Sequence, residues 1–304
     1  MIRSAIITGA TSMVGAACVK ACLAEGMEVC AMVRPGSTRL ERLPANEKLT
    51  IVECALDQYG SVRLPREKYD TLFHLAWGAT SHEERVIPEK QANNVLCAIA
   101  AVQLAARYGC ERFVGAGSQA EYGPSETLLG PHSPTRPVNA YGVAKNAAQM
   151  LCRIECERKG ISFGWARIFS VYGPYDNQGT LVDSLIEHLE DKKHLPLSSC
   201  EQPWDYLYSD DCGRAMFLIG EKGRPGAIYC VASGESHPLK WFVQKIGELY
   251  GMDLSLDMGR LALPSKPQGL QADITALRRD TGFQPEVPFV EGIRRTIEYK
   301  RRRQ

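Results

Sequence analysis

Net charge is almost absent from this sequence: 36 Lys and Arg side chains stand against 35 Asp and Glu, which leaves a formal charge of +1 over 304 residues. A chain without a basic excess has no long-range field that attracts nucleic acid or anionic lipid, so neither partner is predicted. Long apolar runs are absent as well, and no segment approaches the roughly 18 apolar residues that a membrane-spanning helix needs. The sequence does not open on a basic leader followed by an apolar stretch, and we expect a cytoplasmic protein.

Eleven cysteines are present, but they do not form the closely spaced framework of disulfide-rich secreted domains. Two pairs, Cys18/Cys22 and Cys152/Cys156, have the i,i+4 spacing that places side chains on one helix face, where they could hold a metal ion. No histidine lies near either pair in the sequence. We therefore predict reduced, mostly buried thiols and no metal site.

Strand and helix patterns alternate through the first half of the chain, as a parallel sheet with crossover helices requires. Strands are predicted at 4–8, 28–33, 49–55, 71–76, 112–116 and 162–169, and helices at 13–25, 94–108 and 141–159. The second half is less regular, with helices predicted at 181–189 and 239–250 and loops at 194–203 and 261–271. The predicted fold class is α/β: a Rossmann-type doubly wound parallel sheet with a smaller C-terminal substrate lobe.

The change of pattern after Gly173 and Pro174 marks the predicted domain boundary. We predict a dinucleotide-binding domain over residues 1–172 and a substrate-binding lobe over residues 173–304, with part of 205–235 returning to the first domain. Internal repeats and low-complexity segments are absent from the sequence, which disfavours a solenoid or a disordered scaffold.

The segment TGATSMVG, residues 8–15, joins the first predicted strand to the first predicted helix. At such a junction the backbone amides of the helix N-terminus face the pyrophosphate of a dinucleotide, and glycines permit the close approach. Gly9 and Gly15 occupy the outer positions of a GxxGxxG pattern, whereas Ser12 replaces the middle glycine. The segment predicts a pyrophosphate loop, with an ordinary strand-to-helix turn as the alternative.

The second predicted strand runs into MVRPGS, residues 32–37. NAD-binding folds usually present an acidic side chain to the ribose hydroxyls at this place, and that acid is missing here. Arg34 offers a guanidinium and Ser37 a hydroxyl to an adenosine 2′-phosphate. We therefore predict NADP as the cofactor in preference to NAD, with a solvated surface arginine as the alternative for Arg34.

Tyr141 and Lys145, in the segment YGVAK, lie one turn apart on one face of a predicted helix. A free tyrosine has a pKa of about 10, but a neighbouring ammonium group and an oxidised nicotinamide both favour its anion. Tyr141 could then exchange a proton with a hydroxyl or keto group while the cofactor carries hydride. A YxxxK spacing also occurs by chance in helices, so the pair alone does not decide the function.

Together the motifs resemble the extended short-chain dehydrogenase/reductase family, which comprises sugar-nucleotide epimerases, dehydratases and reductases. The resemblance covers nearly the whole chain. The resemblance rests on the order and spacing of the motifs taken together. The motifs are TGATSMVG, Asp57 in CALD, HLAW at 74–77, Asn94 in NNVLC, Ser118 in GSQAEYG, YGVAK, ARIFSVYGP at 166–174, WDYLYSDD at 204–211, and ADITALRRDTGFQPEVPFVEGI at 272–293.

The resemblance implies that Ser118 hydrogen-bonds the reacting oxygen, that Tyr141 transfers the proton, and that Lys145 binds the nicotinamide ribose and lowers the pKa of Tyr141. In isolation, Ser118 would be read as a serine that caps a turn. The expected cofactor-binding residues are Gly9, Thr11, Ser12, Met13, Val14, Gly15, Arg34, Ser37, Asp57, Leu75, Ala76, Trp77, Asn94, Tyr141, Lys145 and Phe169. The expected substrate-binding residues are Ser118, Gln119, Tyr141, Ser170, Asn177 and Trp204.

Departures from the family pattern narrow the expected reaction. Nucleotide-sugar dehydratases carry an acid-base pair directly after the catalytic serine or threonine, whereas this chain has Gln119 and Ala120 there, so dehydration is disfavoured even though Glu121 is adjacent. Trp204 replaces the arginine that often holds the substrate diphosphate, and WDYLY is similar to the corresponding segment of enzymes that reduce nucleotide-linked 4-keto-6-deoxysugars.

The leading hypothesis is an NADP-dependent oxidoreductase that reduces the keto group of a nucleoside-diphosphate 4-keto-6-deoxysugar. The alternatives are an NAD(P)-dependent nucleoside-diphosphate-sugar epimerase and a non-catalytic dinucleotide-sensing module. The resemblance also implies a homodimer in which the predicted helices 94–108 and 141–159 pair across a two-fold axis.

Overall fold

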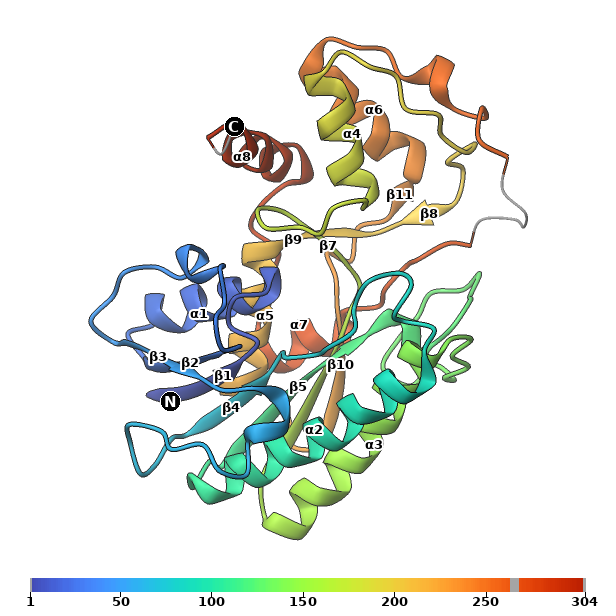
Figure 1. Cartoon of the computed structure of the whole chain (residues 1–304). Coiled ribbons are helices and arrows are strands. Elements are labelled where there is room, and N and C mark those ends of the chain that lie inside the picture. The colour runs from blue at the N-terminus through green and yellow to red at the C-terminus, as the bar shows by residue number, and fades with distance from the viewer. Residues whose placement is uncertain (1, 263–267, 303–304) are drawn as a thin grey trace.

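A seven-stranded parallel sheet occupies the centre of the computed structural model, which describes residues 2–262 and 268–302 (Figure 1). The order of its strands is β10-β6-β5-β4-β1-β2-β3. Their bounds are β1 (Ser4–Thr8), β2 (Glu28–Val33), β3 (Leu49–Glu53), β4 (Thr71–His74), β5 (Arg112–Ser118), β6 (Ser162–Ile168) and β10 (Ala227–Val231). The order reverses between β1 and β4, the place where doubly wound sheets open a ligand crevice beyond the carboxyl ends of their strands. The predicted fold class is confirmed.

The ends of several strands differ slightly from the sequence prediction. β1 and β2 have the predicted bounds, while β3, β4 and β6 end one or two residues early and β5 continues two residues further, to Ser118. The extension of β5 follows from its position inside the sheet, because its whole length pairs in register with β6 from Arg112↔Ser162 to Ser118↔Ile168. Ser118 therefore stands at the last rung of the ladder, at the carboxyl edge of the sheet.

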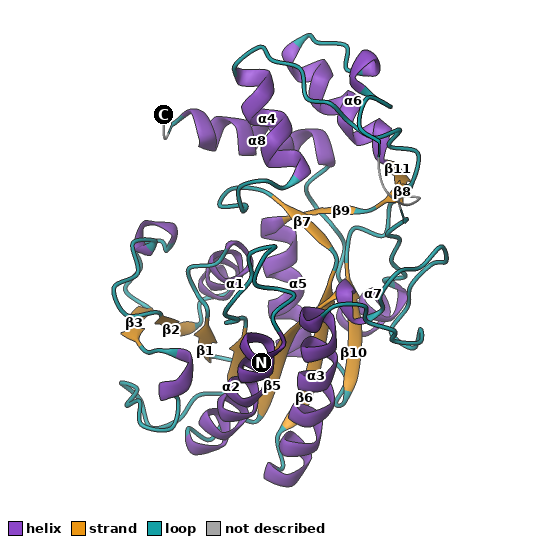
Figure 2. Cartoon of the chain, turned by 45° about the vertical axis from the view of Figure 1, so that its right-hand side comes forward, coloured by secondary structure: helices purple, strands orange, loops and turns teal. Residues whose placement is uncertain are grey.

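Helices cover both faces of the sheet (Figures 1 and 2). α1 (Met13–Ala24) packs with α5 (Ser209–Lys222) on one face, and α2 (Pro88–Arg107) packs with α3 (Ala140–Lys159) on the other. Each layer has its own apolar core, since the buried side chains of α1 and α5 belong to one cluster and those of α2 and α3 to another. α2 begins six residues before the predicted position 94 because Pro88 occupies its first turn, where a missing backbone N–H costs nothing.

The C-terminal lobe is built from α4 (Leu181–Glu190), α6 (Leu239–Tyr250) and α8 (Phe289–Arg301), which surround a third apolar core. Two short ladders lie at its base: β7 (Ser170–Tyr172) with β9 (Tyr206–Tyr208), and β8 (Pro203–Trp204) with β11 (His237–Pro238). The helix predicted at 239–250 is confirmed, and α4 extends one residue beyond its predicted end. Within the loop predicted at 261–271, residues 263–267 lie outside the described residues.

The chain crosses repeatedly between the sheet and the lobe. α5 and β10 both fall within 205–235 and belong to the sheet layer, and α7 (Thr275–Thr281) also packs against α5 and β10. α7 falls within the lobe predicted over residues 173–304, but Leu277 and Phe283 are fully buried in the core that α1 and α5 share. The proposed two-domain division is therefore interleaved along the sequence, with a second return near residue 275.

All eleven cysteines are buried and none forms a disulfide, as predicted. Cys18 and Cys22 face Cys212 at the contact between α1 and α5, where burial raises the pKa of Cys18 well above its usual range. Within the described part of the chain, no helix combines the length and the apolar character that crossing a membrane requires.

Candidate active site

The loop between β1 and α1 has the geometry of a phosphate-binding turn. Gly9 has a φ of 68°, and a Cβ atom on it would lie 2.6 Å from the backbone nitrogen of Ala76, so a larger residue would force apart the loops that follow β1 and β4. Ser12 caps α1: its Oγ accepts a hydrogen bond from the Gly15 nitrogen at 3.0 Å and donates one to the Gly9 carbonyl at 2.9 Å. The serine that replaces the expected glycine thus stabilises the helix N-terminus.

Three loops beyond the carboxyl ends of β1, β2 and β4 hold most of the residues predicted to bind the cofactor. Thr11 is half-buried in the first loop, and Met13 and Val14 are half-buried in the first turn of α1 that follows it. Arg34 is exposed and Ser37 half-buried in the second loop, and Leu75, Ala76 and Trp77 follow β4. Asp57 is exposed in the short η2 helix (Leu56–Gln58). These segments follow the carboxyl ends of β1, β2 and β4, next to the reversal of strand order, where doubly wound sheets usually bind their ligands.

Two further predicted cofactor residues have structural contacts that the sequence did not reveal. Asn94 is 3% exposed; its Oδ1 accepts from the Gly78 nitrogen at 2.7 Å and its Nδ2 donates to the Gly78 carbonyl at 3.0 Å, which fixes the loop after β4. Phe169 follows β6, is 6% exposed, and packs near the Tyr122 ring in the core. Both side chains therefore have a structural role in this fold.

The start of α3 is pressed against the segment that follows Ser118. Asn139 caps the helix, with its Oδ1 accepting from the Gly142 nitrogen at 2.8 Å. A Cβ atom on Gly142 would lie 2.3 Å from the Ala120 carbonyl oxygen, so the glycine of YGVAK permits this close approach. The approach brings Tyr141, on the first turn of α3, beside the Ser118 hydroxyl at the end of β5.

The surroundings of the Tyr141 phenol act on its ionisation in opposite directions. Burial raises the pKa of Tyr141 above its usual range, while the Arg85 guanidinium and the Ser118 hydroxyl lower it and the Glu121 carboxylate raises it further. The Arg85 Cζ atom lies 4.7 Å from the centroid of the Tyr141 ring. Lys145 was expected to lower this pKa, whereas in the structure the cation stacked on the ring is Arg85.

Lys145 is 4% exposed, and its ammonium group is directed toward the sheet and Trp77. Its Nζ donates to the Ala116 carbonyl at 2.8 Å and lies 3.7 Å from the centroid of the Trp77 ring, but 5.8 Å from that of Tyr141. Burial lowers the pKa of Lys145 to about 7; Glu121 opposes this effect and Arg85 adds to it. A cation–π contact with Trp77 therefore holds the amine that the sequence places next to the catalytic tyrosine.

Trp77 itself is anchored by Gln91, which the sequence analysis did not single out. The indole Nε1 donates to Gln91 Oε1 at 2.9 Å, and Gln91 Nε2 donates to the carbonyls of Ala79 and Glu84 at 2.8 and 3.2 Å. Gln91 is 1% exposed, whereas its partners are half-buried, so water has access to these bonds from the partners' side only. No local sequence signal could have revealed this clamp, because its partners are separated by a loop of irregular conformation.

Glu121 is fully buried and acts as a structural acceptor. Its Oε1 accepts from the Ser118 nitrogen at 2.8 Å and from Trp165 Nε1 at 3.0 Å, and its Oε2 accepts from Arg167 Nε at 2.6 Å. Ser118 and Glu121 also form a capping box around the short η3 helix (Gln119–Glu121). The S-x-x-E motif in the sequence is typical of such a capping box. Each oxygen is committed to a protein donor, which removes Glu121 from general acid-base chemistry.

The residues predicted to bind substrate are not all brought together. Gln119 is half-buried next to Ser118, and Ser170 stands opposite Tyr206 where β7 pairs with β9. Asn177 is exposed on the loop after β7. Trp204 lies in β8 opposite His237, half-buried between the sheet core and the lobe core, with its indole nitrogen buried and without a hydrogen-bond partner.

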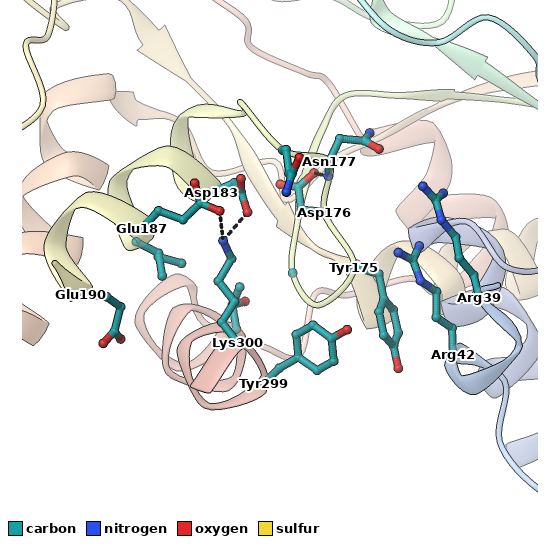
Figure 3. A pocket seen from close by; sticks show the side chains of 14 residues that line it. Arg39, Arg42, Tyr175, Asp176, Asn177, Asp183, Glu187, Glu190, Tyr299 and Lys300 are labelled. Atoms are coloured by element: carbon teal, nitrogen blue, oxygen red, sulfur yellow. Dashed lines mark hydrogen bonds and ion pairs between the residues drawn. The ribbon is translucent and has the colours of Figure 1, made fainter. Parts of the chain in front are cut away.

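A cavity of about 650 Å³ separates the loop after β2 from the C-terminal lobe (Figure 3). Arg39 and Arg42 form one wall, and the residues of the loop after β7, α4 and α8 form the other. The Tyr175 ring bridges the two walls, since the Arg42 Cζ lies 4.8 Å from its centroid and the Tyr299 ring stands edge-on to it at 4.8 Å. Arg42 Nη1 also donates to the Thr11 carbonyl at 3.1 Å, which links the cavity to the phosphate loop.

The fold and this arrangement define a Rossmann-type enzyme with a tyrosine-lysine pair at the carboxyl edge of the sheet. The model of the NAD dependent epimerase/dehydratase family matches residues 5–232, and the chain belongs to this family. It is accordingly an enzyme of the sugar-nucleotide epimerase and dehydratase type that works with a nicotinamide dinucleotide. The family membership agrees with the resemblance seen in the sequence.

Individual relatives are distant in sequence but close in structure. The chain is 23% identical over 243 residues to an uncharacterized UDP-glucose epimerase of Bacillus subtilis, a match that covers 77% of this chain and 75% of the relative. It superposes with a TM-score of 0.87 and 21% identity on a UDP-N-acetylglucosamine 4-epimerase from Methanobrevibacter ruminantium in complex with UDP-N-acetylmuramic acid, covering 100% and 99% of the two chains. A UDP-glucuronic acid 4-epimerase from Bacillus cereus in complex with NAD gives a TM-score of 0.84 at 18% identity, covering 98% and 99%.

Proposed function

We propose that this enzyme is an NADP-dependent reductase of a nucleoside-diphosphate 4-keto-6-deoxysugar. The observation that carries the proposal is the composition of the site: Tyr141 stands beside Ser118, and the positions after Ser118 offer no available acid or base. Gln119 and Ala120 cannot transfer protons, and the Glu121 carboxylate is committed to Ser118, Trp165 and Arg167. Such a site supports hydride transfer coupled to one proton transfer, but it does not support elimination of water.

The proposed roles follow from the positions of the side chains. A bound nicotinamide dinucleotide supplies the hydride that a carbonyl carbon accepts. Ser118 Oγ donates a hydrogen bond to the substrate carbonyl oxygen and polarises it. Tyr141 transfers its phenolic proton to the same oxygen as negative charge develops there. Lys145 fixes the ribose next to the phenol with the ammonium protons that the Ala116 carbonyl leaves free.

The preference for NADP rests on the loop after β2. Arg34 is exposed at the end of the strand, and Arg39, two residues beyond Ser37, is exposed as well. The Ser37 Oγ accepts a hydrogen bond from the Arg39 backbone nitrogen at 3.3 Å, which stabilises the turn between the two arginines. Two guanidinium groups match the charge and the fork geometry of a 2′-phosphate. NAD is the alternative cofactor, because the Bacillus cereus epimerase that resembles this chain is in complex with NAD.

An NAD(P)-dependent epimerase is the second candidate, and the names of the relatives favour it. The Bacillus subtilis relative and the Methanobrevibacter neighbour are both described as epimerases of UDP-sugars. An epimerase keeps its cofactor bound and regenerates it within each cycle, whereas a reductase consumes NADPH in proportion to product. A non-catalytic dinucleotide sensor, the third candidate, would bind cofactor and turn over no sugar.

The test is a measurement of NADPH absorbance with a panel of nucleoside-diphosphate 4-keto-6-deoxysugars, with NMR identification of each product. A reductase consumes one NADPH for each new secondary alcohol. Incubation with UDP-glucose and UDP-N-acetylglucosamine tests the epimerase alternative, since a new sugar stereoisomer would then form without loss of absorbance. Epimer formation without NADPH consumption would overturn the reductase assignment, and NADPH binding without any product would favour the sensor.

The proposed homodimer rests on apolar side chains that α2 and α3 expose. Leu96 on α2 is 66% exposed, and Val143, Met150 and Ile154 on α3 are 52%, 52% and 49% exposed. Large apolar residues that gather on the outer side of two adjacent helices are typical of a surface that another protein covers. We propose that a second copy of the chain covers it, and that the enzyme is cytoplasmic, where its eleven buried thiols stay reduced.

A further inference from the structure

The loop between β4 and α2, residues 75–87, reaches over the N-terminus of α3 and is attached to it. The Tyr141 backbone nitrogen donates to the Arg85 carbonyl at 3.0 Å, so the loop and the helix are joined at the catalytic position itself. Arg85 Nε donates to the Thr80 carbonyl at 2.9 Å within the same loop. The guanidinium is therefore oriented by its own loop, with its Cζ 4.7 Å from the centroid of the Tyr141 ring.

Every element packed against Tyr141 contributes a group that faces it. Ser118 at the end of β5 offers its hydroxyl, Glu121 in η3 its carboxylate, and Lys145 on α3 an ammonium whose Nζ is 5.8 Å from the ring centroid. Trp77 stands edge-on to the ring at 6.1 Å and takes the Lys145 ammonium onto its own face at 3.7 Å. Arg85 is thus the cation nearest to the Tyr141 ring among the described residues.

We infer that Arg85 is a positioning residue for Tyr141, holding the phenol ring in place by stacking on it and stabilising the phenolate that proton transfer leaves behind. The inference rests on the proposed role of Tyr141. During reduction the hydride from the reduced nicotinamide forms a C–H bond at the carbonyl carbon, the carbonyl π bond breaks, and the Tyr141 proton moves to the resulting alkoxide oxygen. The electron pair of the broken O–H bond remains on Tyr141 as the anion that Arg85 faces.

Two properties of arginine suit it to this role better than a second lysine. Its guanidinium keeps its charge at every pH at which the enzyme can operate, whereas burial lowers the pKa of Lys145 to about 7. The planar group also stacks on an aromatic face, which limits rotation of the ring. The effect on ionisation has the required sign, because Arg85 acts against the rise that burial causes in the pKa of Tyr141.

The test measures the ionisation of residue 141 directly, without a sugar substrate. A trifluorinated tyrosine, whose phenol is more acidic than that of tyrosine, is placed at position 141 alone in the full chain, and its fluorine NMR shift is followed against pH with NADP⁺ bound. At the pH where half of the parent is ionised, the ionised-to-neutral ratio in Arg85→Met should be roughly two- to fivefold lower, the range expected for a charge interaction with an exposed partner that solvent screens. Arg63→Met, which changes an exposed arginine away from the site, should leave the titration unchanged.

Arg85→Lys separates charge from shape, since it keeps the cation and should recover part of the lost ionisation. An Arg85→Met titration that coincides with the parent would overturn the inference, and so would an Arg85→Lys titration that coincides with Arg85→Met. Circular dichroism spectra of the variants confirm that each protein is folded.

A kinetic measurement provides a second readout with the dTDP-linked 4-keto-6-deoxysugar as the probe. Reduction requires protonated Tyr141, so turnover falls as the pH rises through its pKa. Removal of Arg85 raises that pKa, and the alkaline limb of the Arg85→Met profile should move to higher pH, whereas a merely structural role would lower turnover at all pH values alike. If the sugar is not reduced, the proposed reductase function fails, but the fluorine titration still decides the role of Arg85. Failure of the proposed function and failure of the Arg85 inference are therefore distinguishable.

Discussion

Glu121→Ala should lower the free energy of unfolding by about 3–5 kcal/mol, the range measured when one partner of a buried ion pair is removed. Glu121 is fully buried and Arg167 is 3% exposed, with Nε and Oε2 separated by 2.6 Å. The substitution leaves the Arg167 charge unpaired inside the protein. It also leaves the Trp165 indole N–H and the Ser118 backbone N–H without the acceptor that both of them use.

Equilibrium denaturation in urea, followed by circular dichroism, measures this loss. Glu291→Gln is the matched control, because the Glu291–Arg295 pair has a similar separation of 2.8 Å but its side chains are 42% and 47% exposed. Its removal should cost no more than about 1 kcal/mol. A double replacement of Glu121 and Arg167 by methionine should recover much of the stability, since no buried charge remains unpaired. A loss of under about 1 kcal/mol in Glu121→Ala would refute the account of this carboxylate as a committed structural acceptor.

Three further expectations concern the cofactor, the assembly and Lys145. Arg34→Ala should weaken NADPH binding while leaving NADH binding almost unchanged, and calorimetric affinities that fall equally for both would contradict the NADP assignment. Ile154→Glu should turn a dimer into a monomer in sedimentation experiments, because it places a charge on the exposed apolar face of α3; a parent that is already monomeric would remove the basis for this. Burial lowers the pKa of Lys145 to about 7, so between about pH 7 and 10 the unfolded chain binds a proton that the folded chain has lost. The stability of the parent relative to Lys145→Met should therefore rise with pH across that window. A stability difference that does not change with pH would contradict this expectation.

Local sequence patterns predicted the parts of the site that depend on local geometry. The glycines at 9 and 15 and the YxxxK spacing each act within one turn or helix, and the structure places them at the carboxyl edge of the sheet. Ser118 was singled out by the family resemblance, because alone it resembles a serine that caps a turn. The alternation of strands and helices in the first half of the chain likewise predicted the parallel sheet, because parallel neighbours require a crossover connection between them.

Contacts between distant segments were not predictable in this way. Arg85 stacks on Tyr141 across 56 positions of sequence, and its loop has no periodic pattern that would reveal the contact. The Gln91 clamp on Trp77 requires knowledge of how α2 packs against the end of β4. The return of α7 to the sheet was missed because Leu277 and Phe283 carry no signal that distinguishes the core of the sheet from that of the lobe. The contacts of Glu121 with Trp165 and Arg167 belong to the same class, since S-x-x-E indicates only its local capping box with Ser118.

The most direct test of the central claim, that Tyr141 supplies the proton for hydride transfer to a nucleotide-linked keto-sugar, is the turnover of Tyr141→Phe on a substrate that the parent reduces. The substitution keeps the ring, its stacking with Arg85 and its contact with Trp77, and removes only the phenolic oxygen. Turnover should fall by roughly 10²- to 10⁴-fold, the usual contribution of a general acid, while calorimetry shows NADPH binding close to that of the parent. Near-parental turnover by Tyr141→Phe on that substrate would contradict the account.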